Sequence, residues 1–473
     1  MEKIKILEFF DRIAKDRDRW KKKNSYYWND LKKLCQFLVP ENASVLEIGS
    51  STGDLLANLK ARKKIGIDFS PEMVRVAKGK YPEIDYRVMD AEKINFDEKF
   101  DYVILSNVIG YLPDIQKVFE EIKKVCHSQT KVIVTYYNFL WQPILNLGEF
   151  LRIRMQQPQQ NWLSKKDIEG LLYVSGFDAF KSGERMIFPK YIPILSNLLN
   201  KYIAKLPLFQ KISITNYFIA KPLPEKDGHD LESKYSVSVI IPARNESGNI
   251  ENAVIRTPIM GKHTEIIFIE GNSTDDTWKK IQGIRDKYKN SHDIKIAKQD
   301  GKGKGDAVRK GFDMAKGDIL MILDADLTVP PEDLPKFYEA IASGKGEFIN
   351  GSRLVYNMDE KAMRFLNLLA NKLFSLLFSW LLDQRFKDTL CGTKVLFKND
   401  YEQLKAGRKF FGEFDPFGDF DLIFGASKLN LKIIEIPIRY KERTYGSTNI
   451  SRFRHGLLLL KMCFFASKKI KFI

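Results

Sequence analysis

The chain has few cysteines and no signal-like N-terminus, and each shortage excludes a class of protein. Its 473 residues include four cysteines that lie far apart and form no CxxC pair: Cys35, Cys126, Cys391 and Cys463. We therefore expect neither a zinc site nor a disulfide framework, and a reducing, cytoplasmic compartment is favoured. The N-terminus is charged and continues as an amphipathic stretch, so no signal peptide is predicted.

A long uninterrupted apolar run is also lacking. The most apolar segment, residues 365–382, is broken by polar residues at spacings that share one helical face: Asn367, Asn371, Lys372, Ser375 and Ser379. A helix that spans a membrane tolerates fewer polar residues than this. We expect an amphipathic helix here.

Negatively charged residues are comparatively few, because Lys and Arg outnumber Asp and Glu by 17. This excess indicates an acidic partner such as a nucleotide or an anionic membrane. The sequence has no Arg-rich aromatic motif that would favour nucleic acid, so no nucleic-acid partner is expected.

The length of the chain predicts two domains, since one hydrophobic core rarely serves so many residues. Residues 226–235 are polar, rich in turn formers and without periodicity, which is typical of a linker. We therefore expect a first domain over 1–225 and a second over 236–473. Within the first, we expect a core over 43–136 and an aromatic, Gln-rich insertion over 138–163.

The first half alternates strands and helices, and polar residues stand at the strand ends. The expected strands lie at 45–48, 65–67, 86–89 and 100–105. The first runs into a turn of small residues over 49–53, which lets the backbone approach a ligand and presents amide donors at a helix start. Asp68 ends the second strand at the spacing of a carboxylate that binds ribose hydroxyls. We expect a parallel, doubly wound α/β sheet.

These motifs resemble class I S-adenosylmethionine-dependent methyltransferases, closely over 45–134 and loosely as far as Lys221, with a last antiparallel strand at 211–220. The resemblance implies a Rossmann-like fold with S-adenosylmethionine as cofactor. The glycine loop would hold its methionine part, and the acids after the second and third strands its ribose and adenine. The residues carried over to cofactor binding are Glu47, Gly49, Gly53, Asp68 and Asp90.

One position departs from this family, because Ser51 stands where a middle glycine is usual. A small residue still permits close approach of the backbone if its φ is negative. We therefore expect weakened rather than abolished cofactor binding.

In the second half, residues 319–323 form an unbroken apolar run that predicts a strand buried on both faces. The run ends in Asp324 and Asp326. Hard oxygen ligands suit a divalent cation that also binds substrate phosphates, and ligands collect at the carboxyl ends of strands in open α/β sheets. A strand with a solvated polar turn is the alternative.

The neighbouring motifs favour the cation site. Strands expected at 237–241 and 265–269 end in polar loops, and a glycine turn with two lysines, residues 301–305, opens a helix that leads back to Asp324. Such a basic turn suits a negatively charged sugar nucleotide. Asp275 would either hydrogen-bond a base or cap a helix.

This half resembles family 2 inverting glycosyltransferases of GT-A fold, in the dolichyl-phosphate mannose synthase-like branch, over about 237–451. The resemblance implies Mg²⁺ or Mn²⁺ at Asp324 and Asp326, and an acceptor phosphate at Arg353. It implies that the following residues bind the nucleotide sugar: Pro242, Asn245, Glu246, Glu270, Asp275, Lys304 and Asp324. Two departures are Glu270-Gly271 in place of an acid pair and Thr328 in place of a Gln.

Asp419 and Asp421 are candidate catalytic bases if the acceptor is a hydroxyl, whereas a lipid phosphate acceptor needs no base. The alternative is that both acids stabilise the first turn of a helix. Near the C-terminus, the apolar run 456–465 is flanked by arginines and lysines, which is typical of an interfacial helix on an anionic membrane. A core helix with a solvated basic tail is the competing interpretation.

Together these observations predict a fused enzyme. The second domain would transfer a sugar from a nucleotide diphosphate to a polyprenyl phosphate or glycan, and the first would transfer a methyl group. We expect it in the cytoplasm, peripheral to the membrane. In the alternative, the first domain is a non-catalytic ligand-binding or docking module.

Overall fold

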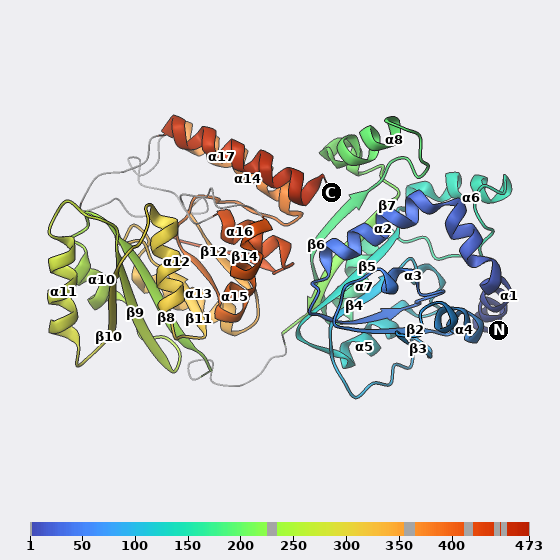
Figure 1. Ribbon diagram of the computed structural model, residues 1–473, viewed down its shortest axis with the longest axis horizontal. Coiled ribbons are helices and arrows are strands. Elements are labelled where there is room, and N and C mark those ends of the chain that lie inside the picture. Colours follow the sequence, from blue (N-terminus) through green and yellow to red (C-terminus); the bar gives the residue numbers. More distant parts are fainter. Residues whose placement is uncertain are drawn as a thin grey trace. The chain divides into compact units, whose positions relative to one another are not determined.

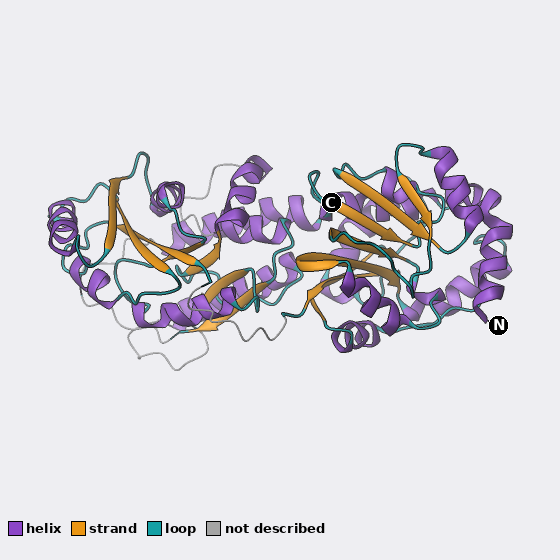
Figure 2. Ribbon diagram, turned by 90° about the horizontal axis from the view of Figure 1, so that it is seen from below, coloured by secondary structure: helices purple, strands orange, loops and turns teal. Residues whose placement is uncertain are grey.

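The computed structural model contains two seven-stranded sheets with helices packed around them (Figure 1; Figure 2). It describes residues 2–224, 234–353, 365–410, 420–438, 445 and 452–472. The chain divides into two units, one of Met1–Leu223 with the last two residues and one of Pro224–Lys471. Most of the linker predicted at 226–235 lies outside the described residues.

The sheet of the first unit has the order β3-β2-β1-β4-β5-β7-β6. Its strands are β1 (Ser44–Ile48), β2 (Lys63–Asp68), β3 (Asp85–Val88), β4 (Phe100–Ser106), β5 (Cys126–Tyr137), β6 (Phe177–Arg185) and β7 (Thr215–Pro222). The first five are parallel, as predicted. β7 is antiparallel to β5 and is the predicted last strand. β6, which the sequence did not predict, pairs antiparallel with β7 and makes the sheet mixed.

The apolar strands of this sheet are buried on both faces. Val103 and Leu105 of β4 belong to one hydrophobic cluster, whereas the intervening Ile104 belongs to another. Because successive strand side chains point to opposite faces, β4 supplies both cores, which is why its apolar run is unbroken.

Helices cover both faces of the first sheet. They are α1 (Glu2–Lys23), α2 (Ser25–Leu38), α3 (Asp54–Ala57), α4 (Pro71–Lys80), α5 (Ile115–Lys124), α6 (Gln142–Phe150), α7 (Lys165–Val174), α8 (Leu195–Asn197) and α9 (Pro207–Gln210). The helix α5 shows how the sequence specifies them: Asp114 caps its N-terminus by accepting the N–H of Lys117, and its apolar residues recur at helical spacing on the buried side. Short helical turns over 198–205 join α8 to α9.

The sheet of the second unit has the order β10-β9-β8-β11-β13-β12-β14. Its strands are β8 (Ser236–Ala243), β9 (His263–Glu270), β10 (Asp293–Lys298), β11 (Ile319–Ile322), β12 (Phe348–Ser352), β13 (Lys394–Phe397) and β14 (Ile433–Pro437). The first four in sequence are parallel, and β13 runs antiparallel between β11 and β12. All four residues of β11 are buried, as the unbroken apolar run predicted.

The helices of the second unit are α10 (Ile250–Arg256), α11 (Thr277–Tyr288), α12 (Lys304–Met314), α13 (Leu334–Ala342), α14 (Phe365–Leu382), α15 (Lys398–Gly407), α16 (Phe420–Lys428) and α17 (Arg452–Ala466). The expected helix over 365–382 is confirmed as α14, which lies beside α17 (Figure 1). Of the helices that the structure describes, none is both long enough and apolar enough to cross a membrane.

Candidate functional sites

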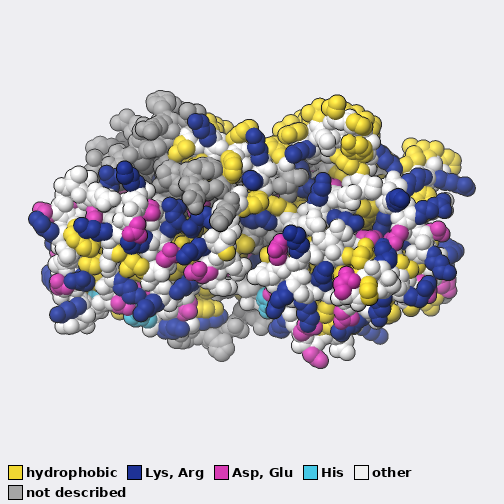
Figure 3. Space-filling view, in the orientation of Figure 1, with side chains coloured by type: hydrophobic (Ala, Val, Ile, Leu, Met, Phe, Trp, Pro, Cys, Tyr) yellow, Lys and Arg dark blue, Asp and Glu magenta, His cyan; other side chains and the backbone are white. Residues whose placement is uncertain are grey.

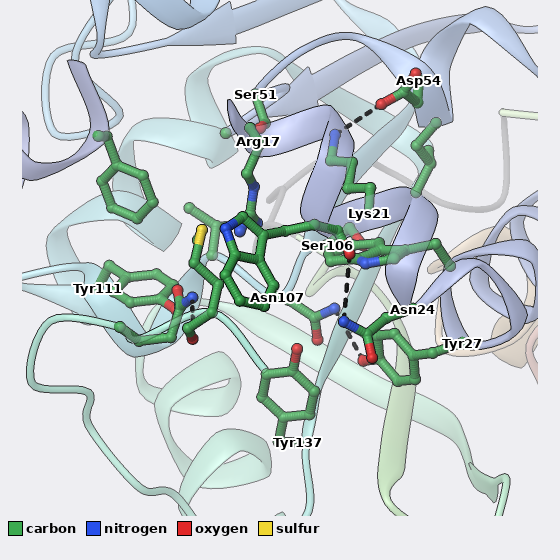
Figure 4. A pocket seen from close by; sticks show the side chains of 18 of the residues that line it. Arg17, Lys21, Asn24, Tyr27, Ser51, Asp54, Ser106, Asn107, Tyr111 and Tyr137 are labelled. Carbon is green, nitrogen blue, oxygen red and sulfur yellow. Dashed lines mark hydrogen bonds and ion pairs between the residues drawn. The ribbon is translucent and has the colours of Figure 1, made fainter. Parts of the chain in front are cut away.

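A cavity of about 730 Å³ opens in the first unit at the carboxyl ends of its central strands. The loops after β1, β2 and β4 form one side, and α1 and α2 cover another (Figure 4). The carboxyl ends of neighbouring parallel strands meet at one edge of a sheet, so residues far apart in the chain converge there. Of the five predicted cofactor residues, four line this cavity: Glu47, Gly49, Asp68 and Asp90.

Gly53, the fifth, is not among the residues that line the cavity. The Tyr86 hydroxyl donates a 3.1 Å hydrogen bond to the carbonyl oxygen of Gly53, and a Cβ at Gly53 would collide with the same ring. The φ of Gly53 is also +81°, a value that favours glycine. Gly53 therefore shapes the turn but does not line the cavity.

Glu47 is a buried carboxyl on the cavity wall. Burial raises its pKa to about 8, although nearby Lys21 opposes this rise. Its Oε2 has no hydrogen-bond partner among the residues that the structure describes. A ligand that donates a hydrogen bond or carries positive charge would satisfy this oxygen.

Asp68 fastens the glycine-containing turn to the end of β2. One carboxylate oxygen accepts the N–H of Ser51 at 2.8 Å, and the other accepts the N–H of Ser70 at 3.0 Å. Burial raises the pKa of Asp68, against the effect of these two amide donors. Each carboxylate oxygen has a second lone pair, so Asp68 can also accept from a ligand.

The turn differs from the expectation in two respects. The φ of Ser51 is +51°, so the assumption of a negative φ at this position is wrong. The amides of Gly49 and Ser50 both donate to the carbonyl oxygen of Ile67, and that of Ser51 donates to Asp68. These three amides are therefore engaged within the protein, because the turn is tied to β2.

The first helix brings cations to the cavity, a contribution that its amphipathic pattern alone did not identify. Lys3 pairs with Asp90 at 2.6 Å, and this contact lowers the pKa of Asp90 against the effect of burial. Lys21 is buried, which lowers its pKa, and it pairs with Asp54 at 2.8 Å. Arg17 also lines the cavity, and its Nε has no hydrogen-bond partner within the described chain.

Aromatic and amide side chains form the opposite end of the cavity (Figure 4). The Asn107 amide donates a 3.0 Å hydrogen bond to the hydroxyl of Tyr27, whereas Oδ1 of Asn107 has no partner among the described residues. Burial raises the pKa of Tyr27 well above its ordinary value, so this phenol is neutral. The rings of Tyr27 and Tyr137 are stacked, with centroids 5.7 Å apart.

The residues of this cavity fit S-adenosylmethionine. The cofactor has a cationic sulfonium and amino group, ribose hydroxyls and an apolar adenine face, and the cavity offers carboxylates, unpaired acceptors and aromatic walls. The unpaired buried oxygens of Glu47 and Asn107 are the observations that favour a polar ligand, because such atoms are costly unless something binds them.

In the second unit, the acid pair after β11 meets the lysine of the glycine turn. Nζ of Lys304, at the start of α12, lies 2.6 Å from Oδ1 of Asp324. Burial would raise the pKa of Asp324, but Lys304, with help from Lys394 and Arg353, outweighs this effect and lowers it. Asp324 is therefore ionised at neutral pH.

Asp326 lies two residues further and is held by Thr328. The N–H and the hydroxyl of Thr328 donate to Oδ1 of Asp326 at 3.1 and 2.8 Å. Thr328, which replaces the Gln of some relatives, thus positions this carboxylate. The described residues contain no cluster of three His, Cys, Asp or Glu that could hold a metal ion. The donor set, two carboxylates, fits a hard cation that takes its remaining ligands from phosphates and water.

The predicted nucleotide residues lie at the ends of β8 and β9, where they hold each other's loops. Oδ1 of Asn245 accepts the N–H of Thr274 at 2.8 Å, and the N–H of Glu246 donates to the hydroxyl of Thr277 at 2.9 Å. Asp275 accepts the N–H of Thr277 at 3.0 Å, but the residue at the N-cap position of α11 is Asp276.

Two further predicted residues belong to the strands themselves. Pro242 lies in β8 opposite Ile269 of β9, and Glu270 ends β9. Oε1 of Glu270 accepts the N–H of Ser273, which fixes the loop that follows. Because residue 271 is a glycine where the family usually has a second acid, Glu270 supplies the single carboxylate of this pair at the strand end.

Arg353 follows β12 and forms a two-pronged ion pair with buried Asp388. Its Nε and one terminal nitrogen donate to the two oxygens of Asp388 at 2.7 and 2.8 Å. Against the effect of burial, Arg353 lowers the pKa of Asp388. Glu435 of β14 accepts the N–H of Asp388 at 2.9 Å, so three segments of the unit meet here.

The segment from Asp388 to Lys394 connects this ion pair to the acid pair. Gly392 lies so close to Asp324 and Lys304 that a Cβ there would collide with both side chains. The segment then enters β13, which pairs with β11 and β12. The 388–394 segment therefore forms one wall of the Asp324 site.

Of the two base candidates, Asp419 lies outside the described residues. Asp421 is in the first turn of α16 and pairs with Arg408 at 3.2 Å and with Arg309 at 3.8 Å. Two arginines therefore hold the Asp421 carboxylate.

Comparisons with known proteins find matches in both units. Residues 46–134 match the family model described as a methyltransferase domain, and residues 238–401 match that of glycosyl transferase family 2. A dolichol-phosphate mannosyltransferase of Pyrococcus furiosus is 41% identical over 122 residues, which cover 25% of this chain and 33% of that protein. An undecaprenyl-phosphate 4-deoxy-4-formamido-L-arabinose transferase of Shewanella sediminis is 30% identical over 141 residues, 29% of this chain and 42% of that one. The chain thus spans about a third to two-fifths of the length of these relatives.

Solved structures that match parts of the chain include both types of domain. A methyltransferase of Thermotoga maritima, a possible histamine N-methyltransferase, is 17% identical and matches 46% of this chain and 99% of its own, with a TM-score of 0.38. Glucosyl-3-phosphoglycerate synthase of Mycobacterium tuberculosis, in complex with Mn²⁺ and UDP, is 16% identical and matches 52% of this chain and 86% of its own, with a TM-score of 0.37.

Proposed function

Because the chain carries a methyltransferase domain and a family 2 glycosyltransferase domain, we propose that it is a bifunctional transferase of glycan or glycolipid biosynthesis. The second unit would transfer a sugar from a nucleotide diphosphate to a polyprenyl phosphate or glycan acceptor. The first would transfer a methyl group from S-adenosylmethionine.

The observation that carries glycosyl transfer is the Lys304–Asp324 contact at the carboxyl ends of parallel strands. The family match covers this site, and the relatives named above act on polyprenyl phosphates according to their names. An ammonium has three donors, so Lys304 can hold Asp324 and also contact a phosphate. A Mg²⁺ or Mn²⁺ ion held by Asp324 and Asp326 would offset the charge that develops on the leaving diphosphate.

Arg353 is proposed to bind an acceptor phosphate. Asp388 fixes the plane of its guanidinium through two hydrogen bonds, which orients the group without a cost in side-chain entropy at binding. A phosphate acceptor is already ionised, so this arrangement requires no base. The pairing of Asp421 with two arginines favours this acceptor over a hydroxyl.

A donor screen tests this proposal. Nucleotide sugars would be incubated with a polyprenyl phosphate and with free glycans in the presence of Mn²⁺, and products identified by mass. We expect a glycosylated polyprenyl phosphate whose formation is lost in Asp326→Ala. Full activity of that variant, or activity indifferent to chelators, would exclude the metal role.

Methyl transfer is supported by the cavity of the first unit, which four predicted cofactor residues line together. When bound, S-adenosylmethionine supplies an electrophilic methyl group: its S–CH₃ bond breaks with the electron pair remaining on sulfur, and the carbon bonds to a lone pair of the acceptor. The protein's part is to orient the two reactants and exclude water. Asn107 and Tyr27 stand at the end of the cavity where an acceptor could be positioned.

Titration of S-adenosylmethionine into the full chain tests the first unit. We expect saturable binding that Asp68→Asn weakens. A chain that does not bind the cofactor, or binds it equally well after this change, would favour the alternative of a non-catalytic docking module.

The helix α17 is proposed as a peripheral membrane contact. Leu459 and Met462 face inward, whereas Leu460 and Phe464 are exposed beside Lys461. Exposed apolar residues flanked by cations are typical of interfacial helices.

A further inference from the structure

The first unit exposes an unusual amount of apolar surface in two segments, residues 139–153 and 191–212. More than half of the large apolar side chains that the structure describes as exposed fall in these segments. The most exposed are Phe150 at 82%, Ile194 at 83% and Leu208 at 77%. Single exposed apolar residues are ordinary on protein surfaces, but a concentration of this kind marks an interaction surface. We call it the apolar platform.

The two segments form one surface. The indole N–H of Trp141 donates a 2.8 Å hydrogen bond to the carbonyl oxygen of Ile212, and the amide of Asn138 donates to that of Lys211 at 2.9 Å. Hydrophobic atoms gather over α6 and α8 on the same side of the first unit (Figure 3; compare Figure 1). The platform therefore joins residues about 70 positions apart in the sequence.

The platform borders the mouth of the cavity. Ile144, Leu147 and Leu151 are each more than half exposed and also line the cavity. The cavity is also lined by the three residues that directly precede the second segment: Phe188, Pro189 and Lys190. A molecule that rests on the platform with its apolar part can therefore extend a polar part into the cavity.

The charge of the platform identifies its partner. Residues 186–214 include four lysines and no acid, and Lys201 and Lys211 are exposed. In residues 138–163 the only acid is Glu149, which forms an ion pair with Arg154, while Arg152 is exposed. Apolar side chains inserted at the interface and flanked by cations are complementary to an anionic lipid leaflet.

We propose that the apolar platform docks the first unit onto an anionic lipid surface, with the mouth of the cavity beside the leaflet. The methyl acceptor is then an amphipathic molecule delivered from that leaflet; this second statement rests on the proposed methyl transfer. The platform residues belong to the first unit, whereas α17 belongs to the second.

Vesicle flotation of the full chain tests the docking. The probe is a vesicle of phosphatidylcholine mixed with phosphatidylglycerol, compared with phosphatidylcholine alone. We expect the wild type to bind the anionic vesicles. The affinity of the triple variant Phe150→Glu/Ile194→Glu/Leu208→Glu for these vesicles should be lower by roughly tenfold or more. None of these three residues lines the cavity.

Matched controls separate docking from misfolding. Val174→Glu places the same charge on α7 of the same unit, at a residue 62% exposed outside the platform, and should leave vesicle binding unchanged. The triple variant should bind S-adenosylmethionine as the wild type does. Vesicle binding needs no cofactor, so a failure of docking and a failure of methyl transfer are distinguished.

Three results would overturn the proposal. One is a triple variant that floats with anionic vesicles as well as the wild type. Another is loss of binding in Phe464→Glu of α17 while the triple variant still binds. The third is a wild-type dimer, seen by sedimentation, that the triple variant dissociates without any change in vesicle binding, because the platform would then pair with a second copy.

Discussion

The ammonium of Lys304 lies 2.6 Å from Oδ1 of Asp324, and Gly392 packs against both side chains. One residue comes from a glycine turn, one from the end of a buried strand and one from a segment almost 70 residues further along the chain. At this contact the Lys304 ammonium could bind the phosphates of a nucleotide diphosphate, while the Asp324 carboxylate could bind a cation that the same phosphates also coordinate.

Replacing Lys304 should impair nucleotide binding. We expect Lys304→Met to weaken the binding of GDP or UDP by about 10- to 100-fold, because a charge-assisted contact to phosphate is lost. Titration calorimetry with Mn²⁺ present measures this. Lys345→Met, at an exposed lysine that pairs with Glu339 outside this turn, is the control and should bind as the wild type does.

Adding one methyl group at Gly392 should disrupt the same site. A Cβ there would collide with Asp324 and Lys304, so Gly392→Ala must push the two side chains or the 388–394 segment apart. We expect the rate of sugar transfer to fall by about 100-fold, which is the loss that a small misplacement of reacting groups typically causes. Gly407→Ala, where a Cβ meets nothing within 4 Å, should leave transfer rates unchanged.

The ion pair of Arg353 and Asp388 should contribute strongly to the stability of the second unit. Asp388→Ala removes the carboxylate that a largely buried guanidinium holds through two hydrogen bonds, so we expect a loss of about 3 kcal/mol or more in unfolding free energy. Urea denaturation followed by a probe in this unit measures the loss. Asp313→Ala, which removes an exposed partner of Lys405, should cost about 1 kcal/mol or less. Equal losses would contradict the assigned role.

Ser51 is the residue whose substitution tests the turn in the first unit. Its φ of +51° suits glycine, so Ser51→Gly should retain or improve S-adenosylmethionine binding, while the N–H that donates to Asp68 remains. Ser51→Val should weaken binding by about tenfold, because a β-branched residue rarely adopts positive φ. Equal cofactor affinity of both variants in titration calorimetry would show that the turn conformation does not matter.

Glu47 should make the first unit less stable as pH rises. Its pKa is about 8 in the folded chain against an ordinary value of 4.5, so between these values only the folded state holds the proton. Stability therefore falls as pH rises from about 4.5 to about 8 and is then constant. Relative to Glu47→Gln, which lacks this titration, the wild type should lose stability by roughly a few kcal/mol, since one pKa unit is worth about 1.4 kcal/mol.

Thermal unfolding between pH 5 and pH 9 would show this difference. Glu41→Gln, at an exposed carboxylate paired with Lys60, is the control and should follow the wild type across the range. Parallel curves for the wild type and Glu47→Gln would contradict a protonated, buried Glu47.

Much of the fold was predictable because local patterns specify strands and their ends. Apolar runs at 45–48 and 319–323 predicted strands, the second of them buried on both faces, and both are central strands of their sheets. Polar residues directly after such strands meet at one sheet edge, so Asp68 and Asp324 could be assigned to ligand sites. β6, β10, β12, β13 and β14 were missed, because short strands with mixed patterns carry a weak signal.

Other features required the tertiary structure. That Arg17 and Lys21 of α1 reach the cavity depends on how α1 packs, and the sequence showed only an amphipathic helix. The sequence also did not show that Tyr86 packs against Gly53, which was assigned to the cofactor with Gly49. The sign of φ at Ser51 was likewise decided by the ties between the turn and β2.

The sequence by itself determined the two α/β units and the order of their strand-end acids, because these follow from local periodicity and spacing. Its motifs also resemble those of two transferase families. Only the tertiary structure decided which side chains are buried and which are exposed. Residues 186–214 show this most clearly: their apolar composition suits a core, yet many of these side chains face outward. Burial depends on contacts between distant parts of the chain, which composition does not encode.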